Sequence, residues 1–306
     1  MSAKKIDVFG LGQCAWDYIG EIDNYPSSNT KCEMSAMITQ GGGPVATALV
    51  ALTRWGFSCS FCGLVGRDTF GTQIIKSLQD ENIDTNPMIL RSGFESQFAF
   101  IAAEKNGGNR TIFWRRPTGI PILAEELNYT KIRQCRVLHT DGLFSEASIA
   151  AARYAQKAGV TVVVDAGTLR EGMLDLAKYS DYFIVSESFA RGLVKADDPH
   201  QACEKLQLLG PEVVGVTLGA KGYLARHRNQ WIEGEAYRVN AIDTTGCGDL
   251  FHAGITNGIL KGWTLEKTLD FSAWAAALVS TKLGGRAGIP SLDEFKSQFD
   301  RKSSEK

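Results

Sequence analysis

Short apolar segments alternate with segments of helical periodicity along almost the whole chain. Apolar runs at residues 6–10, 60–63, 137–140, 160–165, 182–185 and 213–218 have the length and composition of buried β-strands. Apolar residues recur at helical spacing over residues 44–55, 68–81, 148–158, 199–209, 249–261 and 265–282. This alternation predicts an α/β fold with a doubly wound, mostly parallel sheet that is flanked by helices on both faces.

Two stretches depart from this alternation. Residues 14–40 are rich in turns and contain no helical pattern, and residues 96–116 have the pattern of a hairpin around Asn106-Gly107-Gly108-Asn109. Strands that cannot join a parallel sheet in sequence order are expected to form a small separate β-sheet, which would act as a lid. We therefore expect one α/β domain over residues 1–306, with a lid and a frayed charged tail at residues 301–306.

Composition and charge exclude several classes of protein. A net charge of -1, with no basic cluster denser than Arg115-Arg116, gives no basis for a nucleic-acid partner. The longest apolar stretch, residues 273–279, is too short to span a membrane, so no membrane partner is expected. Residues 1–5 are polar, and the seven cysteines are scattered, which favours reduced thiols and a cytoplasmic location. Cys59 and Cys62 form a C-x-x-C pair inside a predicted strand, which favours a core role over redox chemistry.

Residues 243–249, with the sequence D-T-T-G-C-G-D, form the segment most suggestive of chemistry. Its glycines allow a sharp turn, and the helix that follows points unpaired N–H groups back into that turn. This arrangement favours the binding of a phosphoryl group. Asp249, at the start of this helix, is placed to accept a proton from an attacking hydroxyl. The structural alternative is a helix-capping aspartate after a glycine-rich turn.

Three segments together resemble a known family. Residues 243–254 resemble the C-terminal signature of the ribokinase/PfkB carbohydrate kinases. Residues 41–48, with Gly56 and the G-x-x-G-x-D-x-x-G run at 63–71, are similar to the N-terminal signature, and residues 217–222 resemble the segment that contacts nucleotide phosphates. Residues 41–44 and 284–290 also look somewhat like those of sulfofructose kinases. The resemblance implies a ribokinase-like fold.

It also implies an activity and its site. An ATP-dependent kinase of this family uses Mg²⁺ and, in many relatives, a monovalent cation such as K⁺, and it phosphorylates a hydroxyl of a sugar or sugar derivative. The implied general base is Asp249, beside an anion hole of Gly246, Cys247 and Gly248. Asp17, Gly42, Gly43 and Thr47 would bind substrate, and Ser186, Glu187, Thr217, Gly219 and Gly222 would bind ATP. The cation would lie among Asp243, Thr245, Ser280 and Gly285.

The sequence departs from the family pattern at three points. Thr47 stands where an Asn is common, which alters a substrate contact. Ser186-Glu187-Ser188-Phe189 replaces the usual N-x-x-E, so the Mg²⁺-water network is changed, with Glu187 as a candidate substitute. Cys247 replaces an Ala, but only its backbone N–H is needed.

Basic residues of the lid leave the charge of the substrate open. Arg110, Arg115 and Arg116 are either solvated surface charge or a site for an anionic sugar, to which Lys31 and Arg286 would add positive charge. Residues 141–148 contain no basic side chain, which argues against a sulfonate clamp. A nucleoside such as adenosine is the alternative substrate, with Trp16, Phe98 or Phe113 as stacking partners.

Two other function classes fit less well. The G-x-G-x-x-A run at residues 10–15 mimics a dinucleotide fingerprint, but residues 16–26 lack the helix that an NAD-dependent oxidoreductase needs. A non-catalytic sugar-binding regulator would be favoured if Asp249 or the glycines were missing. A small lid that exposes Phe98, Phe100 and Phe113 is expected to pair with a second copy, which predicts a homodimer.

Overall fold

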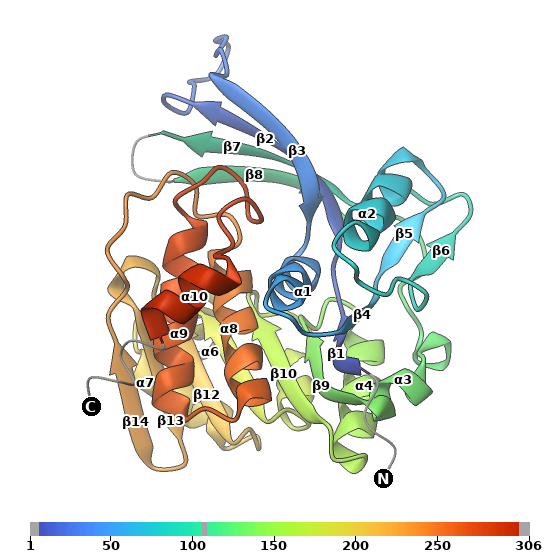
Figure 1. The fold of residues 1–306 in the computed structure, drawn as a ribbon, viewed down its shortest axis with the longest axis vertical. Coiled ribbons are helices and arrows are strands. Elements are labelled where there is room, and N and C mark those ends of the chain that lie inside the picture. Colours follow the sequence, from blue (N-terminus) through green and yellow to red (C-terminus); the bar gives the residue numbers. More distant parts are fainter. Residues whose placement is uncertain (1–5, 106–108, 300–306) are drawn as a thin grey trace.

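A large mixed sheet forms the centre of the computed structural model, which describes residues 6–105 and 109–299 (Figure 1). Within that part of the chain the sheet has eight strands, of which β13 and β14 are antiparallel and the others parallel. In spatial order they are β14 (Gln230–Gly234), β13 (Tyr223–His227), β12 (Val213–Thr217), β11 (Tyr182–Ser186), β10 (Thr161–Ala166), β9 (Cys135–Thr140), β1 (Ile6–Leu11) and β4 (Cys59–Cys62).

Helices cover both faces of this sheet, because successive strand residues point to opposite sides. In β1, Val8 belongs to one buried cluster and Phe9 to the other. The first cluster includes residues of α1 (Pro44–Arg54), α8 (Cys247–Lys261) and α9 (Leu265–Val279), with α10 (Leu292–Phe299) at its margin. The second includes residues of α3 (Tyr129–Gln134), α4 (Ser145–Lys157), α5 (Met173–Ala177), α6 (Glu187–Val194) and α7 (Pro199–Gln207). The predicted α/β architecture is confirmed.

The start of α8 differs from the predicted position, because a capping turn sets the residue at which the helix begins. The helix predicted from residue 249 begins two residues earlier, because Gly246, at φ 84°, forms its N-cap. The segments that became α3, α5, α6 and the β13–β14 ribbon were not predicted, because each is too short for a clear period. None of the helices in the described residues has the length and apolarity that a bilayer span requires.

A second sheet, called the lid below, lies across one end of the large sheet (Figure 1). Its strands are ordered β3 (Ala36–Gly42), β2 (Ala15–Ile22), β7 (Phe98–Glu104) and β8 (Arg110–Arg115). The predicted hairpin is present as the antiparallel pair β7–β8. Residues 106–108 of its predicted turn and the predicted frayed tail, 301–306, lie outside the described residues.

Part of the lid's outer face is covered by α2 (Thr69–Gln79). Phe70 of this helix contacts Tyr18 and Phe98, with ring centroids 6.1 and 5.6 Å apart. Next to α2, β5 (Leu64–Gly66) and β6 (Ile89–Arg91) form a short parallel pair. Phe98, which we expected to be exposed, is therefore half-buried, whereas Phe113 is 51% exposed.

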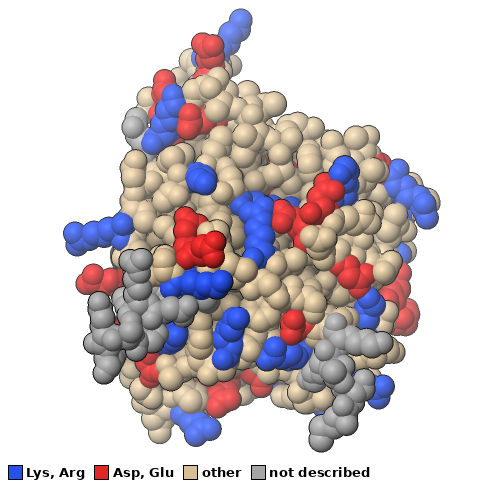
Figure 2. Space-filling view, in the orientation of Figure 1, with Lys and Arg blue, Asp and Glu red and all other residues tan. Residues whose placement is uncertain are grey.

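Charged side chains are interspersed over the face seen in Figure 2, where basic and acidic groups neighbour one another. Arg54 pairs with Glu81 at 2.6 Å, and Lys76 pairs with Asp80 at 2.7 Å one helical turn away. Such exposed pairs contribute little to stability. The partners do balance one another's charge.

Candidate active site

A cavity of about 300 Å³ lies between the lid and the first turn of α8. It brings together most of the residues predicted for substrate and phosphoryl transfer. Those that line it are Asp17, Gly43, Thr47, Arg110, Thr245, Gly246, Asp249 and Gly285. Residues that were not predicted also line it, namely Gln13, Ala15, Gln40, Pro44, Gln97, Ala99, Ile101, Ile112 and Trp114.

The register of the lid strands determines which side chains face this cavity. Asp17 of β2 lies directly opposite Gln40 of β3 and beside Ala99 of β7, and Ala99 lies opposite Trp114 of β8. Residues paired in this way share one face of a sheet. The row Gln40, Asp17, Ala99 and Trp114 therefore forms a continuous wall of the cavity.

Asp17 provides a buried carboxylate in this wall. It is 6% exposed, and burial raises its pKa to about 7 even though the nearby Arg286 guanidinium opposes the shift. Gly42 was predicted to let the sugar approach closely. In the structure, the space beside its Cα is taken by the Asp17 carboxylate, so Gly42 makes room for the binding residue.

The loop before α8 is fastened to the segment after α9 through Asp243. One carboxylate oxygen of Asp243 accepts the N–H of Thr245 and the other accepts the N–H of Gly284, each at 2.8 Å. The carbonyl of Ser280 accepts the N–H groups of Ile242 and Asp243 at 2.7 and 3.1 Å. These bonds hold the two segments of the predicted cation site side by side.

Gly246 cannot be replaced by a larger residue without strain. Besides its positive φ, a Cβ at this position would lie 2.7 Å from the Cα of Gly285. The first hydrogen bond of the α8 ladder is donated by Leu250 to the Gly246 carbonyl at 2.9 Å. The N–H groups of Gly248 and Asp249 precede that ladder, whereas the N–H of Cys247 donates to Thr244 at 3.3 Å. The first turn of α8 thus presents backbone N–H groups at the cavity end of the helix.

Asp249 is held at this end in an environment that favours its protonated form. Burial raises its pKa to about 7, and the negative charges of Asp165 and Asp17 add to the effect. The positive charges of His252 and Arg110 oppose it. A carboxylate that titrates close to neutral pH is suited to general-base catalysis.

Of the basic residues predicted to contact substrate, Arg110 alone is brought to the cavity wall. It donates through Nη1 to the Thr244 hydroxyl, which links the lid to the loop before α8. Arg115 lies an odd number of residues away on β8, so it points to the opposite face, where it pairs with Glu95. Lys31 lies in an exposed segment away from the cavity wall. The prediction that Lys31 and Arg115 contact substrate is therefore not supported by their positions.

The aromatic residues proposed to stack on a nucleoside are also on the wrong face. Trp16, Phe98 and Phe113 alternate with the cavity residues Asp17, Ala99 and Ile112, so they point away from the cavity. The aromatic side chain at the cavity is instead Trp114.

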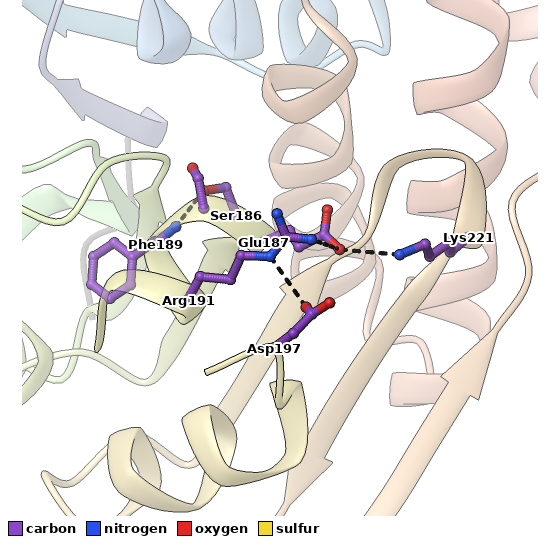
Figure 3. Close-up of polar contacts among 7 residues, drawn as sticks. Ser186, Glu187, Phe189, Arg191, Asp197 and Lys221 are labelled. Atoms are coloured by element: carbon purple, nitrogen blue, oxygen red, sulfur yellow. Dashed lines mark hydrogen bonds and ion pairs between the residues drawn. The ribbon is translucent and has the colours of Figure 1, made fainter. Parts of the chain in front are cut away.

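The residues predicted to bind ATP lie at the ends of neighbouring strands. Ser186 is the last residue of β11 and caps α6 by accepting the N–H of Phe189 at 3.0 Å (Figure 3). Glu187 binds Arg191 and Lys221 at 3.1 and 3.3 Å. Thr217 ends β12, the strand beside β11. The 3₁₀ turn Gly219–Lys221 follows, and Gly222, at φ 96°, closes it by accepting the N–H of Leu218 at 2.8 Å. The five predicted nucleotide residues therefore cluster at one edge of the sheet.

Sequence reasoning missed several polar residues of this region. Asp141 follows β9, and Asp165 lies near the end of β10, so both occupy the carboxyl edge of the parallel sheet. Ligands of open α/β sheets bind at that edge, and this position was the signal available in the sequence. Gln97 lines the cavity and is 1% exposed, and no hydrogen-bond partner for its Oε1 exists among the described residues. His252, one turn after Asp249 on α8, had no spacing that would have singled it out.

A family model of the pfkB family carbohydrate kinases matches residues 5–292. The chain belongs to this family. Among its relatives, a probable chloroplastic fructokinase-6 from Arabidopsis thaliana is 29% identical over 276 residues, which cover 82% of this chain and 71% of the relative. A ribokinase from Haemophilus influenzae is 27% identical over 261 residues, 83% of this chain and 85% of the relative. The protein is thus a phosphotransferase that acts on an alcohol group.

Solved structures share this fold at low sequence identity. A putative ribokinase from Agrobacterium tumefaciens superimposes with a TM-score of 0.89 at 23% identity, covering 98% of this chain and 99% of that chain. A putative ribokinase II from E. coli, in complex with ATP and Mg²⁺, has a TM-score of 0.81 at 21% identity and covers 97% and 99%. The ribokinase-like fold is confirmed, and kinases of the pfkB family use ATP with Mg²⁺.

The residues present fit a Mg²⁺ ion that enters with the nucleotide. No group of three or more His, Cys, Asp or Glu side chains is placed to hold a metal among residues 6–105 and 109–299. Mg²⁺ commonly binds through substrate phosphates, water and one or two carboxylates, so a preformed protein cage is not needed. When bound, the ion would neutralise charge on the phosphates. Asp249, at the start of α8, and Asp165, near the end of β10, are the carboxylates on the phosphoryl side that would hold it, whereas Asp17 belongs to the lid wall.

Of the residues predicted to hold a monovalent cation, Thr245 suits such an ion and Ser280 does not. The Thr245 hydroxyl is buried, and it lacks a hydrogen-bond partner within the described chain, as a free ligand oxygen would. The Ser280 carbonyl already accepts two N–H groups, which occupy both of its lone pairs. Ser280 is therefore a poor ligand in this arrangement, and a K⁺ site remains a prediction.

Proposed function

We propose that the protein transfers the γ-phosphate of ATP to a hydroxyl of an uncharged sugar. The observation that carries this proposal is that Asp17 and Asp249 line the same cavity, one from the lid and one from the first turn of α8. The two carboxylates are close enough for the negative charge of Asp17 to contribute to the raised pKa of Asp249. Two carboxylates on opposite walls suit a ligand that presents several hydroxyl groups.

The two carboxylates have separate tasks in this reaction. Asp17 accepts hydrogen bonds from substrate hydroxyls, and bonds to an ionised acceptor are roughly twice as strong as neutral ones. Asp249 removes the proton from the attacking hydroxyl. The N–H groups at the start of α8 stabilise the negative charge on the phosphoryl group during transfer, helped by the helix dipole.

The charges around the cavity favour an uncharged sugar over an anionic one. Arg110 is the one Lys or Arg side chain that lines the cavity within the described chain, and it is bound to Thr244 beside the phosphoryl loop. An anionic substrate would meet Asp17 and Asp249 with Arg110 as the one lining cation of the described chain, because the buried Arg286, which acts on both carboxylates, does not line the cavity. Arg110 is better placed to contact the transferred phosphoryl group. The fructokinase and ribokinase relatives support the same substrate class.

The polar and apolar parts of the cavity also suit a monosaccharide. Its volume is at the lower end of the range for small-molecule sites, about 300–1,000 Å³. Gln13, Gln40 and Gln97 provide neutral hydrogen-bonding groups. Ile112 and Trp114, which are 42% and 48% exposed, supply apolar surface that a bound sugar ring would cover.

A substrate screen tests this function. ATP consumption and thermal shift would be measured with uncharged ketoses, aldoses and polyols, and with sugar phosphates, sugar acids, sulfosugars and nucleosides. We expect turnover with an uncharged sugar, and Asp17→Asn should raise its KM. Turnover confined to an anionic sugar or a nucleoside would contradict the proposal.

The proposal also covers the oligomeric state of the protein, its cellular compartment and the binding of a monovalent cation. The exposed Phe113 and Met37, at 51% and 55%, support a homodimer formed through the lid. All seven cysteines are free, which supports a reducing compartment such as the cytoplasm. The unpartnered Thr245 hydroxyl supports K⁺ binding beside the loop, with Asp243 and Gly285 as neighbours. Activity in K⁺ compared with Li⁺ buffers tests the last point.

A further inference from the structure

Gln97 is a buried glutamine whose side chain lines the cavity between the lid and α8. It is 1% exposed, and its Oε1 has no hydrogen-bond partner within residues 6–105 and 109–299. Most buried side-chain polar atoms in proteins are hydrogen-bonded, because an unpaired one has given up water without a replacement. A ligand in the cavity is placed to supply the partner that the protein does not.

The two other glutamines of the cavity differ from Gln97 in this respect. Gln13 and Gln40 are half-buried, and in the described part of the chain neither has a buried polar atom without a partner. Solvent can therefore satisfy their side chains. The need for a partner is specific to Gln97.

The backbone of Gln97 is held in place on both sides. Its carbonyl oxygen accepts the N–H of Trp16 at 3.1 Å, near the start of β2 and β7. The preceding residue, Ser96, donates its backbone N–H and its hydroxyl to the two carboxylate oxygens of Asp68, each at 2.7 Å. The Ser96 hydroxyl also accepts the N–H of Gly66 at 2.9 Å. Gln97 thus presents its side chain from a fixed position, as a residue that selects a ligand must.

The register of the lid places Gln97 close to Asp17. Ala99 lies beside Asp17, and Gln97 lies two residues before Ala99 on the same face of β7. With strands about 4.8 Å apart and a rise of about 3.3 Å per residue, the Cα atoms of Gln97 and Asp17 are about 8 Å apart. Hydroxyl groups on different carbons of one sugar ring can therefore meet both side chains.

We propose that Gln97 determines which sugar is phosphorylated, by hydrogen bonding one hydroxyl that neither Asp17 nor Asp249 contacts. The inference rests on the proposed function, since it names a specificity residue for the same reaction. A carboxamide has an acceptor oxygen and two N–H donors, and rotation about its last bond exchanges them, so it can accept from a hydroxyl or donate to one. A sugar without this hydroxyl would leave the buried carboxamide unpaired and would be rejected.

The chain offers a matched pair of buried glutamines for a test. Gln73 of α2 also has a buried Oε1 that lacks a partner among the described residues, but it does not line the cavity. Methionine has nearly the shape of glutamine and no amide, so Gln97→Met and Gln73→Met remove the same group at the two places. Melting temperatures would confirm folding. Gln97→Ala, which also removes the amide, would replace Gln97→Met if that variant did not fold.

Monodeoxy analogues of the sugar found in the substrate screen identify the contact. kcat/KM would be measured for the sugar and for each analogue that keeps the hydroxyl to be phosphorylated. We expect the wild type to lose about a hundredfold or more with one analogue, since sites that bind a hydroxyl can reject its absence by about 10⁴–10⁵. In Gln97→Met that ratio should fall to about tenfold or less, because the amide that required the hydroxyl is gone. The ratios for the other analogues should stay as in the wild type, and Gln73→Met should keep every ratio.

The outcomes separate this inference from the proposed function. A role in folding alone would lower kcat/KM by one factor for all sugars, so unchanged ratios in a folded Gln97→Met protein would overturn the inference and leave the function standing. The same altered ratio in Gln73→Met would also overturn it, because contact with the sugar would not be needed. Calorimetric affinities of the sugar and the analogues, measured without ATP, should repeat the pattern independently of phosphoryl transfer. Turnover confined to an anionic sugar or a nucleoside would instead overturn the proposed function, and the deoxy series of that substrate would decide the role of Gln97. Failure of every compound in the screen would overturn both.

Discussion

The carboxylate of Asp17 fills the space that a side chain at position 42 would need. A Cβ on Gly42 would lie 1.9 Å from Oδ2 of Asp17 and 2.5 Å from its carboxyl carbon. Asp17 is almost fully buried, so it has little room to turn away. The two residues are diagonal neighbours on the β2–β3 pair, since Asp17 lies opposite Gln40 and Gly42 lies two residues further along β3. The glycine leaves the space in which the carboxylate lies.

Gly42→Ala is therefore expected to displace the Asp17 carboxylate and weaken sugar binding. A lost hydrogen bond to a charged group costs about 1.5–3 kcal/mol, which corresponds to a rise in KM of roughly ten- to a hundredfold. Steady-state kinetics with varied sugar measures this effect, and ATP titration should give an unchanged affinity. Asp17→Asn should show a loss of similar size. A normal KM for Gly42→Ala would show that Asp17 does not hold the sugar.

Activity should fall steeply below neutral pH. Burial raises the pKa of both Asp17 and Asp249 to about 7, so each carboxyl group is protonated below that value and ionised above it. Binding and proton transfer both need the ionised forms, so log kcat/KM should rise with a slope approaching about 2 below pH 7 and level off above it. In Asp17→Asn the slope should fall to about 1. An acid limb centred near pH 4 would contradict the environment described for these residues.

Arg110 and Arg115 offer a matched pair on one strand. Arg110 faces the cavity and binds Thr244, whereas Arg115 faces outward and pairs with Glu95. Arg110→Ala should lower kcat/KM by about tenfold or more, because it removes a positive charge beside the transferred phosphoryl group. Arg115→Ala should leave both kcat and KM unchanged, since its ion pair is exposed. Equal losses in the two variants would show that Arg110 has no special contact with the reactants.

The parts of the fold that were predictable are those with a strong local signal. The helix after Gly43 has a Pro at its first turn and eight buried residues, and the turn before α8 has two glycines, so both were apparent from the sequence. The short helix α6 and the β13–β14 ribbon were not, because their few residues carry no clear period and tertiary packing decides their state.

In the candidate site, too, the residues that stand in a local motif were predictable and those placed by tertiary packing were not. Asp17, Asp249 and the glycines stand in motifs, so their grouping around one cavity was predictable. The face on which Arg115, Trp16 and Phe113 lie depends on strand register, and a shift of one residue exchanges the two faces. Asp165 and His252 become neighbours only when β10 packs against α8, which no local pattern in the sequence reveals.

The lid is expected to mediate dimer formation through its outer face. Phe113→Asp would place a charge in the centre of an apolar contact and should shift the protein to monomer in light scattering at micromolar concentration. Leu208→Asp is the control, because Leu208 is 88% exposed at the end of α7, away from the lid. A wild-type monomer with full activity would contradict lid pairing.

Asp249→Asn and Gly246→Val separate the two functions of the α8 turn. Asn keeps the size of the side chain and the start of the helix but cannot accept the substrate proton. General-base catalysis contributes about 10²–10⁴ in rate, so kcat should fall by that factor while ATP still binds, since the backbone N–H groups and the predicted nucleotide residues are unchanged.

Gly246→Val should have a different effect. Valine is strained at φ 84°, and its Cβ would collide with Gly285, so the turn itself must move. Both ATP affinity and kcat should therefore decline, because the N–H groups that face the phosphoryl group lose their alignment. Single-turnover rates and ATP titration on both variants, with melting temperatures to confirm folding, provide the comparison. If Asp249→Asn kept more than about a tenth of the wild-type kcat, the proton would have another acceptor, and the assignment of Asp249 as the base would be wrong.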